Sequence, residues 1–486
     1  MPAHTSGRVD WRRMSAAGGV IACALAVAAL AAAGLGIGAA ASRGSPASPY
    51  DHPAPRMAAP TAHDRVLVVA PHPDDESVAC GGLIAGAVAA GAAVHVVYIT
   101  NGDAFRAAAQ RLFSEERVPS RDYLRLAQMR QREALLALAK LGVNKGQAVF
   151  LGYPDRGIDQ LWLRNWEISH PYTSHYTGVA RSPYANSLRP NAPYAGRALL
   201  HDLEAAIREF GPTMVVAPHP RDAHGDHWAS YCFTVAALYE LKLLDSVKLW
   251  LYLVHSHDQW LSRSGNLMDP TAAPTVADDT HTKWRTLLLS ANAALRKREA
   301  ISEHATQLLV MGRRLTNFAR RRELYGQVGV APLGGLGAAT AKPRTVIGSS
   351  RHAGRHLHTL SKQREQPASV TEVPRQEEDR GRRLTPDARI VAVQASITPT
   401  GLRVRLDLAG RPSPAVEYRV HWRLLCRGRV EPPEARAMRP TSQPHARSVE
   451  TTLDLPDGVG ALMLAADTRR DGKPLDRTSW ALLKSQ

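Results

Sequence analysis

The sequence predicts an α/β protein with a Rossmann-like, mostly parallel sheet covered by helices on both faces, followed by a small C-terminal all-β, sandwich-like domain. Two short apolar runs, Val66–Ala70 and Thr213–Ala217, each end abruptly in Pro-His-Pro and precede a helical pattern. Toward the C-terminus, short alternating runs are separated by turn residues. The first pattern is typical of an open α/β sheet, where ligands bind beyond the carboxyl ends of the strands.

The first strand end carries an imidazole and a run of acids, in His72-Pro73-Asp74-Asp75-Glu76. His72 and Asp75 are three residues apart, so a turn can point both side chains at one ion. Asp74 between them would point elsewhere and stay free to move protons. The alternative is that the acids only stabilise a helix N-terminus, but a cap needs one acid and explains neither His72 nor the paired prolines.

The second strand end has a related composition, Pro218-His219-Pro220-Arg221-Asp222-Ala223-His224-Gly225-Asp226-His227. If the two strands are neighbours in a parallel sheet, their ends bring His72, Asp75 and His227 together. Two imidazoles and one carboxylate with an open fourth position are the usual make-up of a catalytic zinc site.

Taken together, the two motifs resemble the zinc-dependent N-deacetylases of the PIG-L/LmbE type. The second motif has glycine at Gly225, where the family often has proline. The resemblance covers roughly residues 64–325 and neither end of the chain. Further matches are Thr100-Asn101-Gly102-Asp103, Arg130-x-x-Glu133, Leu151-Gly152-Tyr153-Pro154-Asp155, Gln307 and Glu323.

The resemblance implies a role for each motif residue. One zinc ion per chain would be held by His72, Asp75 and His227, and Asp74 would be the general base. His224 would stabilise the oxyanion or protonate the leaving amine. Asp226 would orient an imidazole, and Asp222 is a second candidate for that task. The alternative for His224 and Asp226 is a solvated loop or a helix cap.

Weaker substrate-binding candidates lie at neighbouring strand ends. Asp103 follows the predicted strand Val94–Thr100, and would contact water at the metal or substrate, or else cap the next turn. Tyr153 and Asp155 follow the predicted strand Ala148–Leu151, and would contact sugar hydroxyls or simply form the turn.

His255 ends the predicted strand Trp250–Val254 and is followed closely by His257. A histidine pair at a strand end suggests a second metal, but exposed or hydrogen-bonded loop histidines are the simpler interpretation. If His255 is functional, we expect it to line the substrate cleft.

Two longer segments complete the predicted catalytic domain. The segment Ile158–Pro193 is rich in aromatic and polar residues, which would stack against sugar rings, pin the loop to the domain, or do both. The segment Thr282–Tyr325 has apolar spacing that predicts two packed helices.

The N-terminus predicts export. Residues 1–15 are basic, residues 16–41 form an uncharged apolar run long enough to span a bilayer, and residues 42–63 form a Pro/Ala-rich spacer. The apolar run is either an uncleaved transmembrane anchor with the catalytic domain outside, or a signal segment cleaved near Ala39-Ala40-Ala41, which would give a secreted protein.

The remaining boundaries follow from composition. We expect the deacetylase-like domain at residues 64–332, a flexible basic linker at 333–386 and the β domain at 387–486. Strand patterns in the last region include Arg389–Val393, Leu402–Leu406, Val416–Val420 and Ala461–Leu464. No catalytic constellation is visible there.

The formal net charge is +17. A basic exported protein would favour an anionic component of the cell envelope, and the apolar segment would bring it to the membrane. We do not expect a nucleic-acid partner, because no aromatic-basic motif is present; an arginine-rich composition alone would also produce the charge.

Three functions remain open from the sequence. The first is a zinc hydrolase that removes N-acetyl groups from an amino-sugar-containing substrate. The second is a related zinc amidase that cleaves a larger amide conjugate. The third is a non-catalytic envelope-binding protein on the same scaffold, against which the retained Asp74 argues.

Overall fold

The computed structural model describes residues 54–255, 282–333, 344–348 and most of 385–485. Residues 50–486 form one compact unit. The predicted basic segment 1–15 and apolar segment 16–41, like most of the spacer, lie outside the described residues, so the anchor or signal stays a prediction. Within the described ranges, no helix is both long and apolar enough to cross a membrane.

A seven-stranded sheet in the order β3-β2-β1-β4-β5-β7-β6 forms the centre of the first domain. Its strands are β1 (Arg65–Ala70), β2 (Ala93–Thr100), β3 (Ala148–Tyr153), β4 (Met214–Pro218), β5 (Lys248–Tyr252), β6 (Thr282–Leu288) and β7 (Arg322–Val328). The first five strands in this order pair in parallel. The strand order reverses between β1 and β4, and the carboxyl edge at such a switch point is the usual binding crevice of this architecture.

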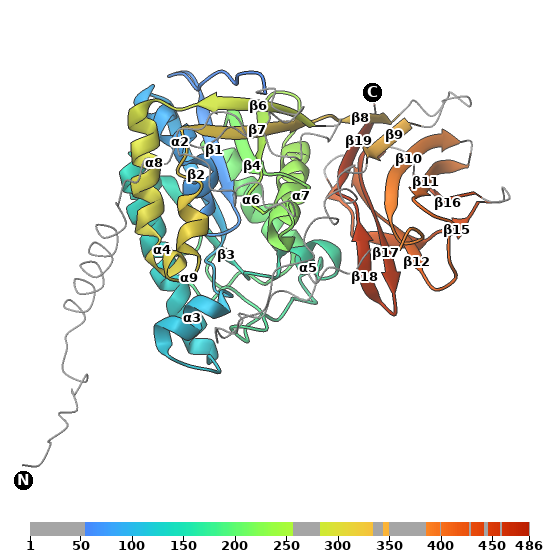
Figure 1. Cartoon of the computed structure of the whole chain (residues 1–486), viewed down its shortest axis with the longest axis horizontal. Helices are drawn as coiled ribbons and strands as arrows, with labels where there is room; N and C mark the ends of the chain where they lie inside the picture. Colours follow the sequence, from blue (N-terminus) through green and yellow to red (C-terminus); the bar gives the residue numbers. More distant parts are fainter. Residues whose placement is uncertain are drawn as a thin grey trace, which may run out of the picture. The chain divides into compact units, whose positions relative to one another are not determined.

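Helices cover both faces of the sheet (Figure 1). Within β1, Val66 and Val68 belong to the apolar core that also contains residues of α2, α4 and α8, whereas Leu67 and Val69 belong to the core with residues of α6 and α7. Burial on both faces is what a central parallel strand requires. The helices are α2 (Asp75–Ala89), α3 (Arg106–Phe113), α4 (Ser120–Leu141), the short 3₁₀ turn η2 (Lys145–Gln147), α5 (Ile158–Leu163), α6 (Gly196–Phe210), α7 (Gly225–Glu240), α8 (Ala291–Glu303) and α9 (Ala305–Thr316).

A glycine allows close packing on α2. A Cβ atom at Gly82 would lie only 2.2 Å from Leu289 Cδ1, and one at Gly81 would lie 2.9 Å from Lys297 Cγ. The two glycines therefore admit Lys297 of α8 and Leu289, which lies two residues before that helix.

The prediction for Thr282–Tyr325 is correct in its middle and wrong at its ends. The two packed helices are α8 and α9, but they are flanked by β6 and β7, which pair antiparallel from Thr282↔Val328 to Leu288↔Arg322. The run Thr282–Leu288 alternates buried and exposed positions over most of its length, which is the period of a strand. We read it as helical because its apolar residues continue into α8.

The C-terminal region forms two packed antiparallel sheets, as predicted. One has the order β15-β16-β11-β10-β9 and the other β13-β12-β17-β19-β8, with β14 on β12 and β18 on β17. Apolar side chains from both sheets form one core. The strands are β8 (Ala331–Leu333), β9 (Arg344–Gly348), β10 (Ile390–Thr398), β11 (Gly401–Leu408), β12 (Glu417–Cys426), β13 (Arg429–Val430), β14 (Glu434–Ala437), β15 (Arg439–Pro440), β16 (Ser448–Leu453), β17 (Val459–Arg470), β18 (Lys473–Arg477) and β19 (Ala481–Ser485).

The predicted linker 333–386 is not linker throughout. Its described part includes β9, which pairs antiparallel with β10. Just before it, β8 pairs in parallel with β19. The strands β8 and β9 therefore form edges of the β domain, although they precede the strand patterns that the sequence predicted.

Candidate metal and active site

The turn after β1 holds the first group of site residues. The backbone N–H of His72 donates to Asp75 Oδ2 at 2.9 Å, which fixes the carboxylate at the start of α2. Asp74 between them has φ 150° and ψ −27°, a conformation that is strained for a residue with a side chain. Its N–H donates to Glu76 Oε2 at 3.0 Å, so the turn is held by its own acidic side chains.

The loop after β4 and the start of α7 hold the second group. His224 is the N-cap of α7, and its Nδ1 accepts a hydrogen bond from the N–H of Asp226 at 3.2 Å. His227 lies in the first turn of the same helix and is fully buried. Because β1 and β4 pair in parallel, the two groups meet at one edge of the sheet, as we predicted.

The three predicted metal ligands converge. Asp75 Oδ2 lies 3.3 Å from His72 Nδ1 and 3.2 Å from His227 Nε2. In a tetrahedral site with zinc–ligand distances of about 2.0–2.1 Å, neighbouring donor atoms lie roughly 3.3 Å apart. The separations of Asp75 Oδ2 from the two imidazole nitrogens are therefore those that one zinc ion would need.

In both His72 and His227, the ring nitrogen that does not face Asp75 (the far nitrogen) lies close to another carboxylate. His72 Nε2 lies 3.0 Å from Asp226 Oδ2 and 3.3 Å from Asp155 Oδ1. His227 Nδ1 lies 3.1 Å from Asp222 Oδ2. Such carboxylates orient a metal-binding imidazole and fix which nitrogen carries the proton. Asp226 and Asp222 thus lie beside the two imidazoles, together with Asp155, and their orienting role stays a prediction.

The charges of this cluster fit a cation. Burial alone would lower the pKa of His227, but the carboxylates of Asp222 and Asp75 outweigh burial and raise it to about 10. Among the described residues neither ring nitrogen of His227 makes a hydrogen bond of good geometry, although both are buried. Orphaned buried nitrogens surrounded by acids are what a site made for a divalent ion presents.

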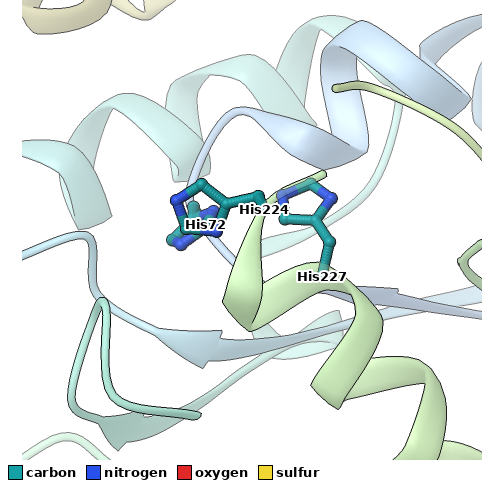
Figure 2. Close-up of side chains that lie close together, drawn as sticks. All are labelled: His72, His224 and His227. Carbon is teal, nitrogen blue, oxygen red and sulfur yellow. The ribbon is translucent and has the colours of Figure 1, made fainter. Parts of the chain in front are cut away.

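His224 adds a third imidazole. Its ring centroid lies 4.8 Å from that of His72 and 5.4 Å from that of His227. The three histidines offer nitrogen atoms that all lie within 4.8 Å of one another, and Figure 2 shows their side chains gathered at the start of α7. Burial, together with the neighbouring imidazoles, holds the pKa of His224 well below its usual value, so its ring is neutral near pH 7.

Asp74 lies beside the cluster without joining it. Its carboxylate Oδ1 is 3.4 Å from Arg130 Nη2, and this arginine also donates to the carbonyl of Pro73 at 2.8 Å. Burial raises the pKa of Asp74 to about 6, against the opposing charge of Arg130. Arg130 approaches so closely because Gly102 has no Cβ, which would lie 2.1 Å from its Nη1.

The weaker candidates fall into two groups. His255 is part of the cluster: its Nδ1 lies 3.1 Å from Asp222 Oδ1, and its ring centroid lies 4.5 Å from that of His227. Asp155 also belongs to it, through His72. Whether either residue touches a substrate stays a prediction, and His257 lies outside the described residues.

Asp103 and Tyr153 are placed differently from our expectation. Asp103 is fully buried and accepts hydrogen bonds from the Tyr184 hydroxyl at 2.6 Å and the Asp155 N–H at 3.1 Å. Tyr153 is also fully buried; it belongs to β3, which is longer than predicted, and donates to Asp202 at 2.7 Å. These contacts hold loops together, so substrate contact by either residue does not agree with the structure.

The aromatic loop after α5 is pinned to the domain. The buried aromatic side chains here are Trp162 in α5, Trp166 and Tyr184 in the loop, and the adjoining Tyr194. Tyr172 and Tyr176 are half-buried. Of the two interpretations that the sequence left open, pinning holds for the buried side chains, whereas sugar stacking by the others stays a prediction.

A buried network beneath Asp74 was not predicted from the sequence. His304 Nε2 lies 3.1 Å from both Glu76 Oε1 and Ser77 Oγ, although 228 residues separate it from Glu76. Glu76 in turn accepts from the Asp74 N–H. The only local signal for His304 is its position at the break between α8 and α9, which does not reveal its partner.

The fold and the cluster define an α/β protein with a candidate metal site at the switch point of its sheet. Residues 67–238 match the family model described as PIG-L, GlcNAc-PI de-N-acetylase. This match confirms, over residues 67–238 of the α/β domain, the resemblance to the PIG-L/LmbE deacetylases seen in the sequence.

One curated relative matches over much of its length. The 1D-myo-inositol 2-acetamido-2-deoxy-alpha-D-glucopyranoside deacetylase of Thermobifida fusca (strain YX) is 26% identical over 268 residues, which are 51% of this chain and 85% of the relative.

Solved structures of deacetylases are also similar. N,N'-diacetylchitobiose deacetylase from Pyrococcus horikoshii has a TM-score of 0.33 at 19% identity, covering 55% of this chain and 84% of its own. A deacetylase involved in the teicoplanin biosynthetic pathway has a TM-score of 0.35 at 17% identity, covering 55% and 98%. At these scores the likeness carries no argument about function.

Proposed function

We propose that this chain is a zinc-dependent hydrolase that removes the N-acetyl group from an amino-sugar-containing substrate. The observation that carries the proposal is that Asp75 Oδ2 lies 3.3 Å from His72 Nδ1 and 3.2 Å from His227 Nε2, with Asp74 in the same turn. The family match and the sugar deacetylase among the relatives support the substrate class.

His72, Asp75 and His227 would hold one zinc ion per chain. When bound, zinc would supply the positive charge that polarises the acetyl carbonyl and lowers the pKa of a nearby water. The carboxylates of Asp226 and Asp222 would hold protons on the far nitrogens of His72 and His227, so that the near nitrogens would give up their protons and serve as ligands.

Asp74 would take a proton from the attacking water and return it to the leaving amine. Its position supports this role, because it lies next to the ligands while its own carboxylate is held by Arg130 rather than by an imidazole. The strained backbone and the Glu76 hydrogen bond fix its direction. A positioned carboxylate of this kind contributes typically about 10²–10⁴-fold to the rate.

His224 would donate a hydrogen bond to the developing oxyanion. Its Nδ1 already accepts from the Asp226 N–H. A neutral imidazole whose Nδ1 is an acceptor carries its proton on Nε2, so the free side of the ring is a donor. This favours oxyanion stabilisation over proton transfer, the two roles that the sequence left open for His224.

We further propose that residues 16–41 export the catalytic domain, either as a membrane anchor or as a cleaved signal. The uncharged apolar run behind a basic segment supports this. The net charge of +17 would then favour an anionic component of the cell envelope.

The test is metal stoichiometry on the purified chain, measured together with acetate release from N-acetylglucosaminyl compounds. We expect one zinc per chain and acetate release that chelation abolishes and zinc restores. Release of a larger acyl group but not acetate would favour the amidase. Stoichiometric zinc without hydrolysis of any amide would favour a binding protein, and no zinc after reconstitution would rule out the metal site proposed here.

A further inference from the structure

Arg423 on β12 is a buried cation with no acidic neighbour among the described residues. Its side chain is fully buried, and its Nε and Nη1 find no hydrogen-bond acceptor within the part of the chain that the structure describes. Its Nη2 donates to the carbonyl of Trp162. Its Cζ lies 3.9 Å from the ring centroid of Trp162 and 3.8 Å from that of Trp166. Two indole faces thus take the place of a counterion.

Trp162 is where the β domain meets the catalytic domain. Its ring centroid lies 5.0 Å from Phe233 on α7 and 5.8 Å from Trp480, which precedes β19. Arg423 and Trp480 therefore close an aromatic box whose other walls come from α5, α7 and Trp166. The apolar core of this face continues from α7 into β12 and β17 without a break.

Helix α5, which carries Trp162, begins at the metal cluster. The N–H groups of Arg156 and Ile158, at the start of the helix, donate to Asp226 at 2.6 Å and 3.0 Å. Asp226 Oδ2 lies 3.0 Å from His72 Nε2. A continuous series of contacts therefore leads from Arg423 to Trp162, along α5, to Asp226 and then to His72.

The helix cannot hold this position by itself. It has only six residues, and isolated helices shorter than about 12–15 residues are marginal in water. Arg156 has φ +57°, in the left-handed region that a non-glycine residue adopts only where surrounding structure enforces it. Its N–H is held by Asp226, and the helix is anchored at Trp162. Two of the four aromatic or cationic partners of Trp162, Arg423 and Trp480, lie outside residues 67–238, the part that the family model covers.

We propose that the C-terminal β domain is part of the catalytic unit, with Arg423 as a positioning residue that holds α5 and, through Asp226, the orientation of His72. The proposal rests on the proposed function in one respect, because it takes His72 as a metal ligand. It gives the β domain a role that neither its sequence nor the family match assigns.

The test compares Arg423→Met with Arg436→Met in the full chain. Methionine keeps the length and apolar character of the side chain and removes its charge. Arg436 is a matched control, because it also lies over a tryptophan of the β domain, 5.7 Å from the Trp422 centroid, but is exposed and pairs with Asp454. Arg423→Lys keeps the charge and should restore part of the loss.

Three readouts are taken at a temperature where all variants are folded. In Arg423→Met, we expect amide exchange at Ile158 to accelerate by about tenfold or more, because the local opening of α5 becomes easier. We expect zinc to bind about 10–100-fold more weakly, the usual result of losing an outer-sphere partner. We expect kcat to fall with little change in KM. Arg436→Met should leave all three unchanged.

A lowered Tm with unchanged exchange, zinc affinity and kcat would show that Arg423 is merely structural and would overturn the proposal. If Arg423→Met does not fold, Trp480→Leu weakens the same aromatic box from the other β-domain side and should give the same pattern. The Ile158 exchange needs neither zinc nor substrate. A wild-type chain without deacetylase activity would therefore refute the proposed function, while the exchange data would still decide whether the β domain positions α5.

Discussion

Helix α2 contacts two clusters of buried charged groups, and they differ in one respect. Midway along the helix, Glu323 receives four hydrogen bonds, from the N–H groups of Gly82 and Leu83, from Lys297 Nζ and from the Tyr325 hydroxyl. At the start of the helix, Asp75 meets His72 and His227, and the buried nitrogens of His227 lack hydrogen bonds of good geometry.

The difference separates structure from function. The Glu323 cluster is saturated, so nothing remains for a ligand to satisfy, and it joins α2 to α8 and β7. The Asp75 cluster brings two imidazole nitrogens to one carboxylate oxygen and leaves both His227 nitrogens without a hydrogen bond of good geometry. Burial of charged groups by itself does not mark a functional site. Metal-binding atoms that converge and lack hydrogen-bond partners do.

The largest effect that this comparison predicts is loss of zinc in His227→Ala. The variant removes one of three converging donors, and we expect zinc affinity to fall by several orders of magnitude. His224→Ala is the matched variant, since it removes a neighbouring imidazole that we assign to the oxyanion; it should keep zinc and lose turnover. Titration calorimetry with zinc measures both. If His224→Ala also lost zinc, His224 would be a ligand and its catalytic role would need revision.

Asp74→Asn should reduce kcat by about 10²–10⁴-fold while one zinc per chain remains bound. The amide preserves the size of the side chain and the contact near Arg130 but accepts no proton. Steady-state kinetics, combined with metal analysis of the same preparation, provide the measurement. Full activity in this variant would exclude Asp74 as the base.

Lys297→Met should do the opposite of the site variants, lowering stability while leaving zinc affinity unchanged. It leaves the buried carboxylate of Glu323 without its cation, which costs about 3–5 kcal/mol of unfolding free energy. The control is Lys140→Met, because Lys140 pairs with Glu303 at 3.4 Å on the surface and such pairs contribute about 0–1 kcal/mol. Denaturant unfolding with and without zinc tests both variants; weakened zinc binding in Lys297→Met would mean that the two clusters are coupled.

The last expected effect concerns the pH dependence set by Asp103, which has hydrogen-bond donors like Glu323 yet faces the carboxylate of Asp155. Burial and Asp155 raise the pKa of Asp103 to about 7, with Tyr184 opposing. A raised carboxyl pKa contributes stability that is fully present below about pH 4 and is lost as the pH rises through about 7, on the order of 4 kcal/mol in all. The charge of Asp103 also acts on the nearby Tyr194 hydroxyl and helps to raise its pKa.

Asp103→Asn should therefore flatten the pH dependence of stability between about pH 4 and 7, since an amide stays neutral throughout. Unfolding free energies measured at several pH values in this window provide the check. A variant with the same slope as the wild type would show that Asp103 does not hold its proton in the folded protein.

The sequence by itself determined the parts of this protein that depend on neighbouring residues. Strands β1 and β4 are continuous apolar runs ended by proline, so their limits and their burial follow from the local pattern. His72 and Asp75 are linked within one turn by the His72 N–H, which is why their three-residue spacing was informative. The alternation in the β domain predicted its strands for the same reason.

Only the tertiary structure decided which distant groups meet. The pairing of Arg130 with Asp74, of His304 with Glu76 and of Arg423 with Trp162 depends on strand order and on how helices pack across the sheet. The run Thr282–Leu288 is a strand because its backbone pairs antiparallel with β7. Local spacing encodes backbone conformation and which face of an element is buried, but a partner hundreds of residues away is selected by the packing of the whole sheet, and no local pattern records it.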